Sequence, residues 1–186
     1  MLGHIPIAQT QAGVLVVPSC SKKEGPFKCL ECSGDFKLKQ GKIKVFHFAH
    51  RHLSPGCSGG GESALHKAGK LLIEKCCCRL IFKGQCVTGK HHITRQYPDS
   101  CAQQEYRYDP HKMYSADVAL FREGEIEAII EVCARHATTG DSLESRTACV
   151  GSDNVFEISA AEILDHQTEL FTTSNAVEIS SLLRYE

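Results

Sequence analysis

Two pairs of metal-ligating side chains lie close together in the first third of the sequence. Cys29 and Cys32 form a Cys-x-x-Cys pair, and a stretch of fourteen residues separates it from the His-x-x-His pair of His47 and His50. A β-hairpin between two such pairs can bring four nitrogen and sulfur ligands around one tetrahedral zinc ion. The spacing therefore predicts a structural zinc site in a small zinc-ribbon-like hairpin.

The sequence leaves the complete ligand set open. His47 and His50 are an odd number of residues apart, so on a regular strand they point to opposite faces. Either the strand ends near Phe48, or His47 is not a ligand and Cys57 completes the site, with His52 as a weaker rival. This segment has few large apolar residues, so we expect bound zinc to contribute to its folding.

Two carboxylates stand in apolar segments later in the chain. Glu131 is the single charged residue in the run AIIEV, and Asp117 lies in the preceding apolar segment. If the loop around Glu123 and Gly124 has three residues, Asp117 faces Glu131, whereas a two-residue turn separates them. An edge strand with Glu131 facing outward is a further alternative. Facing carboxylates repel unless a divalent cation lies between them, which would suit Mg²⁺ or Mn²⁺ and phosphate hydrolysis.

One predicted helix carries a row of polar side chains. Residues 62–79 have apolar positions at helical spacing, and Glu62, His66 and Lys70 follow one another at intervals of four. Side chains at this spacing lie on one face of a helix. A second helix is predicted over residues 160–171, with Ser159 as its N-cap and Glu162 completing a capping box.

The remaining segments favour short strands and hairpins. Strands or hairpins are expected over 5–17, 36–46, 80–83, 85–88, 91–97, 114–122, 125–133 and 154–159. The Gly- and Ser-rich stretch 53–61 is the clearest linker. It predicts an N-terminal strand and zinc-finger-like element over residues 1–58 and a second domain over residues 59–186. The three consecutive cysteines, Cys76 to Cys78, are interpreted as small apolar residues at a helix end.

Charge is distributed unevenly along the chain. Residues 1–116 carry 17 Lys and Arg against 8 Asp and Glu, whereas residues 117–186 carry 4 against 14. Such asymmetry suggests a basic surface for a polyanion beside an acidic cluster. The eleven cysteines are odd in number, and the N-terminus lacks the features of a secretory signal. We therefore expect an intracellular protein, cytoplasmic or nuclear, that is neither secreted nor membrane-spanning.

The order of these segments resembles the competence protein CoiA-like family. The similarity covers about residues 2–170. It includes the Cys-x-x-Cys pair, HFAH over 47–50, ES-x-x-H-x-x-x-K over 62–70, SADVALF over 115–121, AIIEV over 128–132 and NVFEIS over 154–159. The resemblance implies a zinc-finger-like element followed by a PD-(D/E)XK-like nuclease core, an α+β or α/β fold with a central mixed sheet flanked by helices. It also implies a role in DNA processing or recombination.

The resemblance assigns roles to five residues of the second domain. Asp117 and Glu131 would bind the catalytic Mg²⁺ or Mn²⁺, and Glu62, His66 and Lys70 would lie on the first core helix. One position departs from the pattern, because Cys133 stands where the family has Lys or Gln two residues after the glutamate. Lys70 could take over that role, or Arg135 or His136 from the following loop.

Three functions remain open at this point. The first is a metal-dependent endo- or exonuclease acting on DNA. The second is a catalytically degenerate nucleic-acid-binding module that uses its zinc finger and basic N-terminal surface. The third is a protein-interaction adaptor with structural zinc. The retained acidic residues favour the first, whereas Cys133 favours the other two.

Overall fold

The computed structural model describes residues 5–19, 21–22, 25–52, 57, 61–108, 114–133 and 141–181, and the backbone alone at 61–64 and 141–142. The chain divides into two units, residues 1–68 and 69–186. The division falls inside helix α1 (Gly61–Cys76), whose residues from Gly69 onward belong to the second unit. Both units mix strands with helical or irregular segments, so the chain has an α+β fold with several sheets. In the described residues, no helix is long and apolar enough to cross a membrane.

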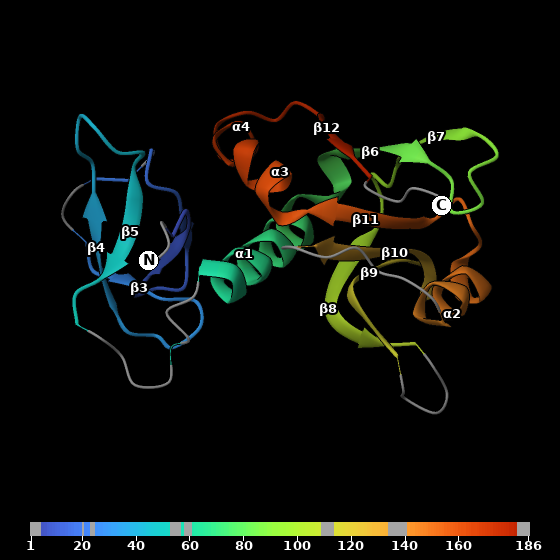
Figure 1. Ribbon diagram of the computed structural model, residues 1–186, viewed down its shortest axis with the longest axis horizontal. Coiled ribbons are helices and arrows are strands. Elements are labelled where there is room, and N and C mark those ends of the chain that lie inside the picture. Colours follow the sequence, from blue (N-terminus) through green and yellow to red (C-terminus); the bar gives the residue numbers. More distant parts are fainter. Residues whose placement is uncertain are drawn as a thin grey trace. The chain divides into compact units, whose positions relative to one another are not determined.

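The first unit contains a small antiparallel sheet of short strands (Figure 1). Its spatial order is β2-β1-β3-β4-β5, and every pairing is antiparallel. The strands are β1 (Ala8–Thr10), β2 (Leu15–Val16), β3 (Phe27–Lys28), β4 (Asp35–Lys39) and β5 (His47–His50). The hairpin predicted over residues 5–17 is thus formed by β1 and β2.

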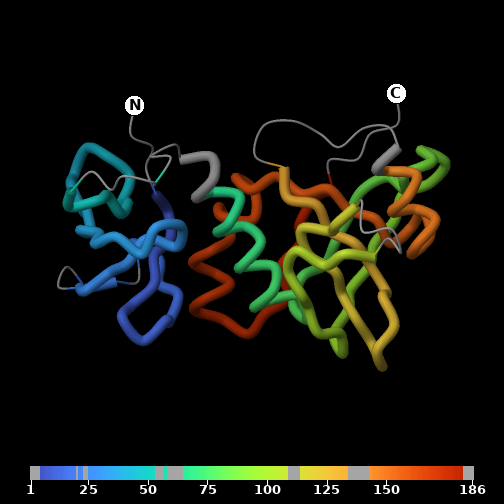
Figure 2. The backbone as a smooth tube through the Cα atoms, turned by 90° about the horizontal axis from the view of Figure 1, so that it is seen from below, coloured from blue at the N-terminus to red at the C-terminus, as the bar shows by residue number. Residues whose placement is uncertain are grey.

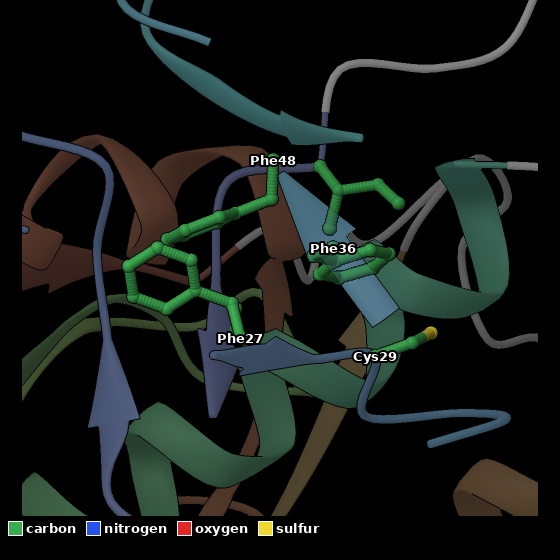
Figure 3. Packing of buried hydrophobic residues seen from close by; sticks show 6 residues of the cluster. Phe27, Cys29, Phe36 and Phe48 are labelled. Atoms are coloured by element: carbon green, nitrogen blue, oxygen red, sulfur yellow. The ribbon is translucent and has the colours of Figure 1, made fainter. Parts of the chain in front are cut away.

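Three phenylalanines from three strands form the centre of this unit. The ring centroids of Phe27 and Phe48 lie 5.0 Å apart, and those of Phe36 and Phe48 lie 6.1 Å apart. Cys29 belongs to the same buried cluster, but its sulfur points away from the rings (Figure 3). The small apolar core therefore holds the backbone of Cys29 in place while its thiol stays available for another partner.

One predicted strand is absent from the first unit. The sequence suggested that Ile43, Val45 and Phe46 form the second strand of the 36–46 hairpin. In the structure, β5 begins only at His47, which pairs with Lys39. Residues 40–46 form the connection, and Ile43 is 98% exposed. Val45 and Phe46 are exposed as well, so strand propensity without burial of these side chains did not produce a strand here.

The second unit contains two sheets. The larger has the order β11-β10-β9-β8, in which β10 pairs in parallel with β11 and antiparallel with β9. Its strands are β8 (Cys101–Arg107), β9 (Ser115–Arg122), β10 (Glu125–Cys133) and β11 (Val155–Ser159). The smaller sheet has the order β12-β6-β7, from β6 (Leu80–Gln85), β7 (His92–Gln96) and β12 (Val177–Ser180). Figure 2 shows β8, β9 and β10, coloured yellow-green to gold, running side by side.

Helices cover both faces of the larger sheet. A Cβ added to Gly69 of α1 would lie 2.9 Å from a methyl group of Val132, so α1 approaches β10 more closely than a side chain allows. The same glycine adjoins helix α3 (Ala160–Asp165). On the other face, Val150 of α2 (Asp141–Val150) packs against Ala119 and Ile129. The result is a mixed sheet between α1 and α3 on one side and α2 on the other (Figure 1).

The helical regions differ in detail from the prediction. The helix predicted over 62–79 ends at Cys76 and continues as a 3₁₀ turn over Cys77–Arg79, with Cys76 and Cys77 buried and Cys78 exposed. The helix predicted over 160–171 is divided into α3 and α4 (Gln167–Thr172). Ser159 caps α3 as expected, by accepting a hydrogen bond from Ala161 N. Glu162 does not complete a capping box, because its Oε1 accepts a bond from Ser180 N.

Candidate functional site

Three cysteines and one histidine form a cluster in the first unit. The members are Cys29, Cys32, His50 and Cys57, and one ligand atom of each lies within 4.8 Å of the others. Cys29 and Cys32 lie on a tight turn after β3, in which Ser33 N donates to Cys29 O. The turn gives Ser33 a positive φ of 57° and presents both sulfurs on one side. His50 comes from the end of β5.

The distances in this cluster match the edges of a zinc tetrahedron. Bonds of about 2.3 Å to sulfur and about 2.0 Å to nitrogen place two sulfurs about 3.8 Å apart and a sulfur and a nitrogen about 3.5 Å apart. The Sγ atoms of Cys29 and Cys57 are 4.0 Å apart, and Cys32 Sγ lies 3.3 Å from His50 Nε2. This Cys₃His set can therefore hold a structural metal such as zinc. Burial raises the pKa of the Cys29 thiol, so a thiolate there needs a neutralising cation.

The structure separates the two histidines that the sequence left as alternatives. β5 remains a strand through His50, so His47 and His50 point to opposite faces. His47 Nδ1 lies 2.8 Å from the carbonyl oxygen of Val45, and His47 is outside the cluster. Cys57 supplies the fourth member, and His52 is exposed. The alternation along β5 explains why only one histidine of the His-x-x-His pair reaches the cysteines.

A second group of polar side chains lies in the second unit, where the pairing of β9 and β10 ends. The last paired residues are Val118 and Ile130. Beyond them, Asp117 N donates to Glu131 Oε1 over 3.3 Å, and Val132 N donates to Asp117 Oδ2 over 2.9 Å. In each strand, a backbone N–H thus donates to a side-chain carboxylate of the neighbouring strand and not to a backbone carbonyl. The two acidic residues are held side by side at the point where the ladder stops.

This neighbourhood depends on a β-bulge that the sequence did not reveal. The β9–β10 turn has only two residues, Glu123 and Gly124, both with positive φ as in a tight hairpin turn. A two-residue turn alone would separate Asp117 from Glu131. The register shifts by one residue between Ile126 and Ala128, so that Val118 lies opposite Ile130. The extra residue of the bulge restores the alignment that a three-residue loop would have given.

Lys70 approaches the acidic pair from α1. Its Nζ lies 3.7 Å from Asp117 Oδ1 and forms a closer ion pair with Glu105 of β8. Lys70 is 8% exposed, so its charge is largely removed from water and is balanced by these carboxylates. Glu105 lies opposite Asp117 in the register and has a φ of +52°, an uncommon conformation for a residue with a side chain.

Arg146 approaches Glu131 from α2 on the other side. Its Nε donates to Glu131 Oε1 over 2.9 Å, and both side chains are nearly buried. Burial, and after it the negative charge of Asp117, raises the pKa of Glu131 to about 7, although Arg146 opposes the shift. The site therefore combines three carboxylates, on β8, β9 and β10, with one cation from each flanking helix.

Sequence reasoning identified part of this group and missed two members. Asp117, Glu131 and Lys70 are brought together, whereas Glu105 and Arg146 were not predicted. Neither β8 nor α2 was predicted: β8 contains few aliphatic residues, and α2 is short and polar. Arg146 is one of only four cations after residue 116, which was the available signal.

The other predicted residues of this group have different positions. His66 lies on α1 and is partly buried. The side chain of Glu62, and residues Arg135 and His136, lie outside the part of the chain that the structure describes. Cys133 is the last residue of β10, is partly buried and pairs with Ser159 of β11. The position that holds Lys or Gln in the resembled pattern is thus at the end of the strand carrying Glu131.

Comparison with known protein families finds a match, which lies in the first unit. Residues 18–58 match the family model of the competence protein CoiA N-terminal domain. The matched segment contains all four members of the Cys₃His cluster. The match shows that this segment, less than a quarter of the chain, is similar to the N-terminal domain of CoiA. No curated protein and no solved structure matches the chain.

Proposed function

We propose that the chain is a metal-dependent nuclease that hydrolyses phosphodiester bonds in DNA, with a zinc-stabilised N-terminal element that contributes to nucleic-acid binding. The observation that carries this proposal is the arrangement of Asp117 and Glu131, with Lys70 Nζ 3.7 Å from the Asp117 carboxylate. A mixed sheet covered by helices on both faces is also the architecture that the resemblance to PD-(D/E)XK nucleases implies.

The donor set fits a hard divalent cation. Mg²⁺ prefers carboxylate oxygens together with water and phosphate oxygens, and Asp117 and Glu131 offer carboxylates from adjacent strands. When bound, Mg²⁺ or Mn²⁺ supplies Lewis acidity and lowers the pKa of a coordinated water. The two carboxylates would hold the cation, and the buried surroundings strengthen their electrostatic interaction with it.

In the resembled family, a lysine two residues after the metal-binding glutamate takes part in catalysis. Lys70 lies close enough to Asp117 to take over this role. Its ammonium group can donate to a phosphate oxygen or orient the attacking water. In hydrolysis the water oxygen forms a bond to phosphorus, the phosphodiester P–O bond breaks, and the departing oxygen takes up a proton. Cys133 cannot replace a cation in this process, since a neutral thiol carries no positive charge.

One observation favours a second candidate function, a nuclease-like module that binds nucleic acid without cleaving it. Glu131 Oε1 already accepts bonds from Arg146 Nε and from Asp117 N. A guanidinium in this place neutralises the acidic pair much as a metal would. If Arg146 stays bound to Glu131 when Mg²⁺ is present, this oxygen of Glu131 is not available as a ligand for the metal ion.

Nucleic acid as the partner is proposed from exposed lysines in the first unit. Lys37 and Lys39 occupy the exposed alternate positions of β4, and Lys42 and Lys44 lie in the exposed connection after it. Lys22 is also exposed, whereas Lys28 is paired with Asp35 at 2.8 Å. Lysines at such positions can neutralise phosphates. The neighbouring Lys23 lies outside the described residues.

The test is cleavage of single-stranded, duplex and branched DNA by the full chain with Mg²⁺ or Mn²⁺. Asp117→Asn and Glu131→Gln should each abolish cleavage, while Glu123→Gln, at an exposed carboxylate in the same hairpin, should leave it unchanged. Binding measured in parallel separates the two candidate functions. Retained binding with no cleavage of any substrate in either metal would support the non-catalytic module and reject the nuclease.

A further inference from the structure

Three side chains of different metal-ligand types meet at one end of the second unit. Cys86 and His91 lie at the two ends of the loop between β6 and β7, and Asp153 lies between α2 and β11. Cys86 Sγ is 3.5 Å from His91 Nδ1, and His91 Nε2 is 3.0 Å from Asp153 Oδ2. One ligand atom of each residue lies within 4.8 Å of the other two. None of these residues belongs to the acidic group of Asp117 or to the Cys₃His cluster.

The β6–β7 loop is built so that its two ends face each other. Cys86 N donates to His91 O over 3.0 Å, and Gly89 N donates to Cys86 O over 2.8 Å. Gly89 has a positive φ of 67°, which closes the loop at little cost for a residue without a side chain. These backbone bonds fix the separation of Cys86 and His91 independently of their side chains.

Backbone and apolar contacts also bring the two loops together. Val87 N donates to Ser152 O over 3.3 Å, and Val87 packs against Val155 in a small buried cluster. Gly151, with a positive φ of 81°, ends α2 and turns the chain toward Asp153. The position of Asp153 next to the β6–β7 loop is therefore preorganised, and a ligand would not have to assemble it.

We propose that Cys86, His91 and Asp153 form a second metal site, for a thiophilic divalent cation of the zinc type, with water in the remaining position. Sulfur, imidazole and carboxylate are the three protein ligand types that zinc accepts. The 3.5 Å separation of Cys86 Sγ and His91 Nδ1 equals the sulfur–nitrogen edge of about 3.5 Å in a zinc tetrahedron. The site differs from the N-terminal cluster in having one thiolate instead of three.

The surroundings suit such a site. Cys86 is 1% exposed, which shields a metal–thiolate bond from water, while the His91 side chain is 53% exposed and leaves an entrance for the ion. An exposed imidazole can turn to present either nitrogen. The Thr88 hydroxyl lies 3.1 Å from Cys86 Sγ and provides an outer hydrogen bond of the kind that orients metal ligands.

Asp153 also interacts with other groups. Arg95 Nη2 lies 3.3 Å from Asp153 Oδ2, and Ser152 Oγ donates to Oδ1 over 3.3 Å. Arg95 therefore competes with a metal for the carboxylate, and the affinity should be lower than that of the N-terminal cluster. A bound ion would link the small sheet, through the β6–β7 loop, to the segment that leads into β11 of the large sheet.

The test counts zinc in the purified full chain after equilibration with Zn²⁺ and removal of the excess. Wild-type protein should contain about one equivalent of zinc more than either the Cys86→Ser or the His91→Gln variant. Cys78→Ser removes an exposed cysteine of the same unit and should keep the full content. Asp153→Asn replaces the carboxylate ligand with a neutral amide, so this variant should lose the second ion as Cys86→Ser and His91→Gln do.

Cobalt substitution adds a spectroscopic readout. Co²⁺ added to a Cys29→Ser/Cys32→Ser/Cys57→Ser protein, which lacks the three thiolates of the N-terminal cluster, should still give a thiolate-to-metal charge-transfer band, and the further change Cys86→Ser should remove it. His91→Gln changes an exposed side chain and so tests the site even if Cys86→Ser fails to fold. Equal zinc content in wild-type, Cys86→Ser and His91→Gln proteins would overturn the proposal. This result is independent of cleavage, so it can fail or succeed separately from the proposed nuclease function.

Discussion

Asp117 donates its backbone N–H to the carboxylate of Glu131 over an N···O distance of 3.3 Å, at the end of the paired part of β9 and β10. Two acidic side chains in neighbouring strands of a sheet are unfavourable when both are ionised. The structure offsets this cost with Lys70 on one side and Arg146 on the other. The balance of charges, and not the acids alone, determines what the site can bind.

The pH dependence of stability should reveal the buried Glu131. Burial and Asp117 raise its pKa from 4.5 to about 7. The folded chain therefore keeps a proton that the unfolded chain releases, so the stabilisation is complete below about pH 4.5 and is lost as the pH rises to about 7. This difference corresponds to a loss of about 3 kcal/mol. Urea unfolding in a chelator should show that Glu131→Gln lacks this loss.

The comparison needs a control at a carboxylate with a different environment. Glu123→Gln, in the exposed turn, should keep the pH profile of the wild-type protein. Because other groups titrate in both proteins, the informative quantity is the difference between wild type and variant at about pH 5 and about pH 8. If the Glu131→Gln and wild-type curves run parallel over this range, Glu131 does not hold the proton.

Zinc binding should distinguish the two histidines of the His-x-x-His pair. His50→Ala removes a ligand whose Nε2 lies 3.3 Å from Cys32 Sγ, so the zinc content of the full chain should fall by about one equivalent. His47→Ala changes a side chain outside the cluster and should keep the wild-type content. Elemental analysis measures both, and thermal unfolding should show lower stability of the first unit only in His50→Ala. Equal zinc loss in the two variants would contradict this ligand assignment.

Part of the fold and the site could be predicted because the chemistry lies in local patterns. The Cys-x-x-Cys turn, the β9–β10 hairpin and the Ser159 cap depend on residues that are close in sequence. A hairpin turn at Glu123 and Gly124 was predicted, with its length left open between two and three residues, whereas the bulge after Ile126 was not predicted, because no residue type marks it. Asp117 is aligned with Glu131 because the extra residue of the bulge offsets the short turn, and the sequence does not show this bulge.

The missed residues come from elements whose formation depends on tertiary contacts. β8 alternates between exposed and partly buried positions and contains few aliphatic side chains, so its pairing with β9 determines its structure. Glu105 reaches Lys70 only because of this pairing. Arg146 lies on α2, which is weakly amphipathic and is held by contacts with β10 and β11. Local propensity is a poor guide to such segments.

Salt dependence should report the lysines of the first unit. Each phosphate neutralised on duplex DNA adds about −0.9 to the slope of log affinity against log salt. The double variant Lys37→Glu/Lys39→Glu, on the exposed face of β4, should bind DNA more weakly. Its slope should be less steep by about the contribution of two phosphate contacts. Lys75→Glu/Lys90→Glu is the matched control, because both lysines are exposed in the second unit. Fluorescence anisotropy over a salt series measures both. A slope that is the same in all three proteins would remove this face from the proposed interface.

Cleavage kinetics should identify the residue that replaces the missing motif lysine. Lys70→Met keeps most of the side-chain volume but removes the ammonium group 3.7 Å from the Asp117 carboxylate, so it should lower the cleavage rate about a hundredfold or more. His66→Ala, one helical turn earlier on α1, should have a smaller effect. Cys133→Lys restores a cation two residues after Glu131 and should be tolerated, or raise the rate of the Lys70→Met protein. Melting curves for each variant separate loss of chemistry from loss of fold. Equal rates for Lys70→Met and wild type, in folded protein, would exclude Lys70 from the reaction.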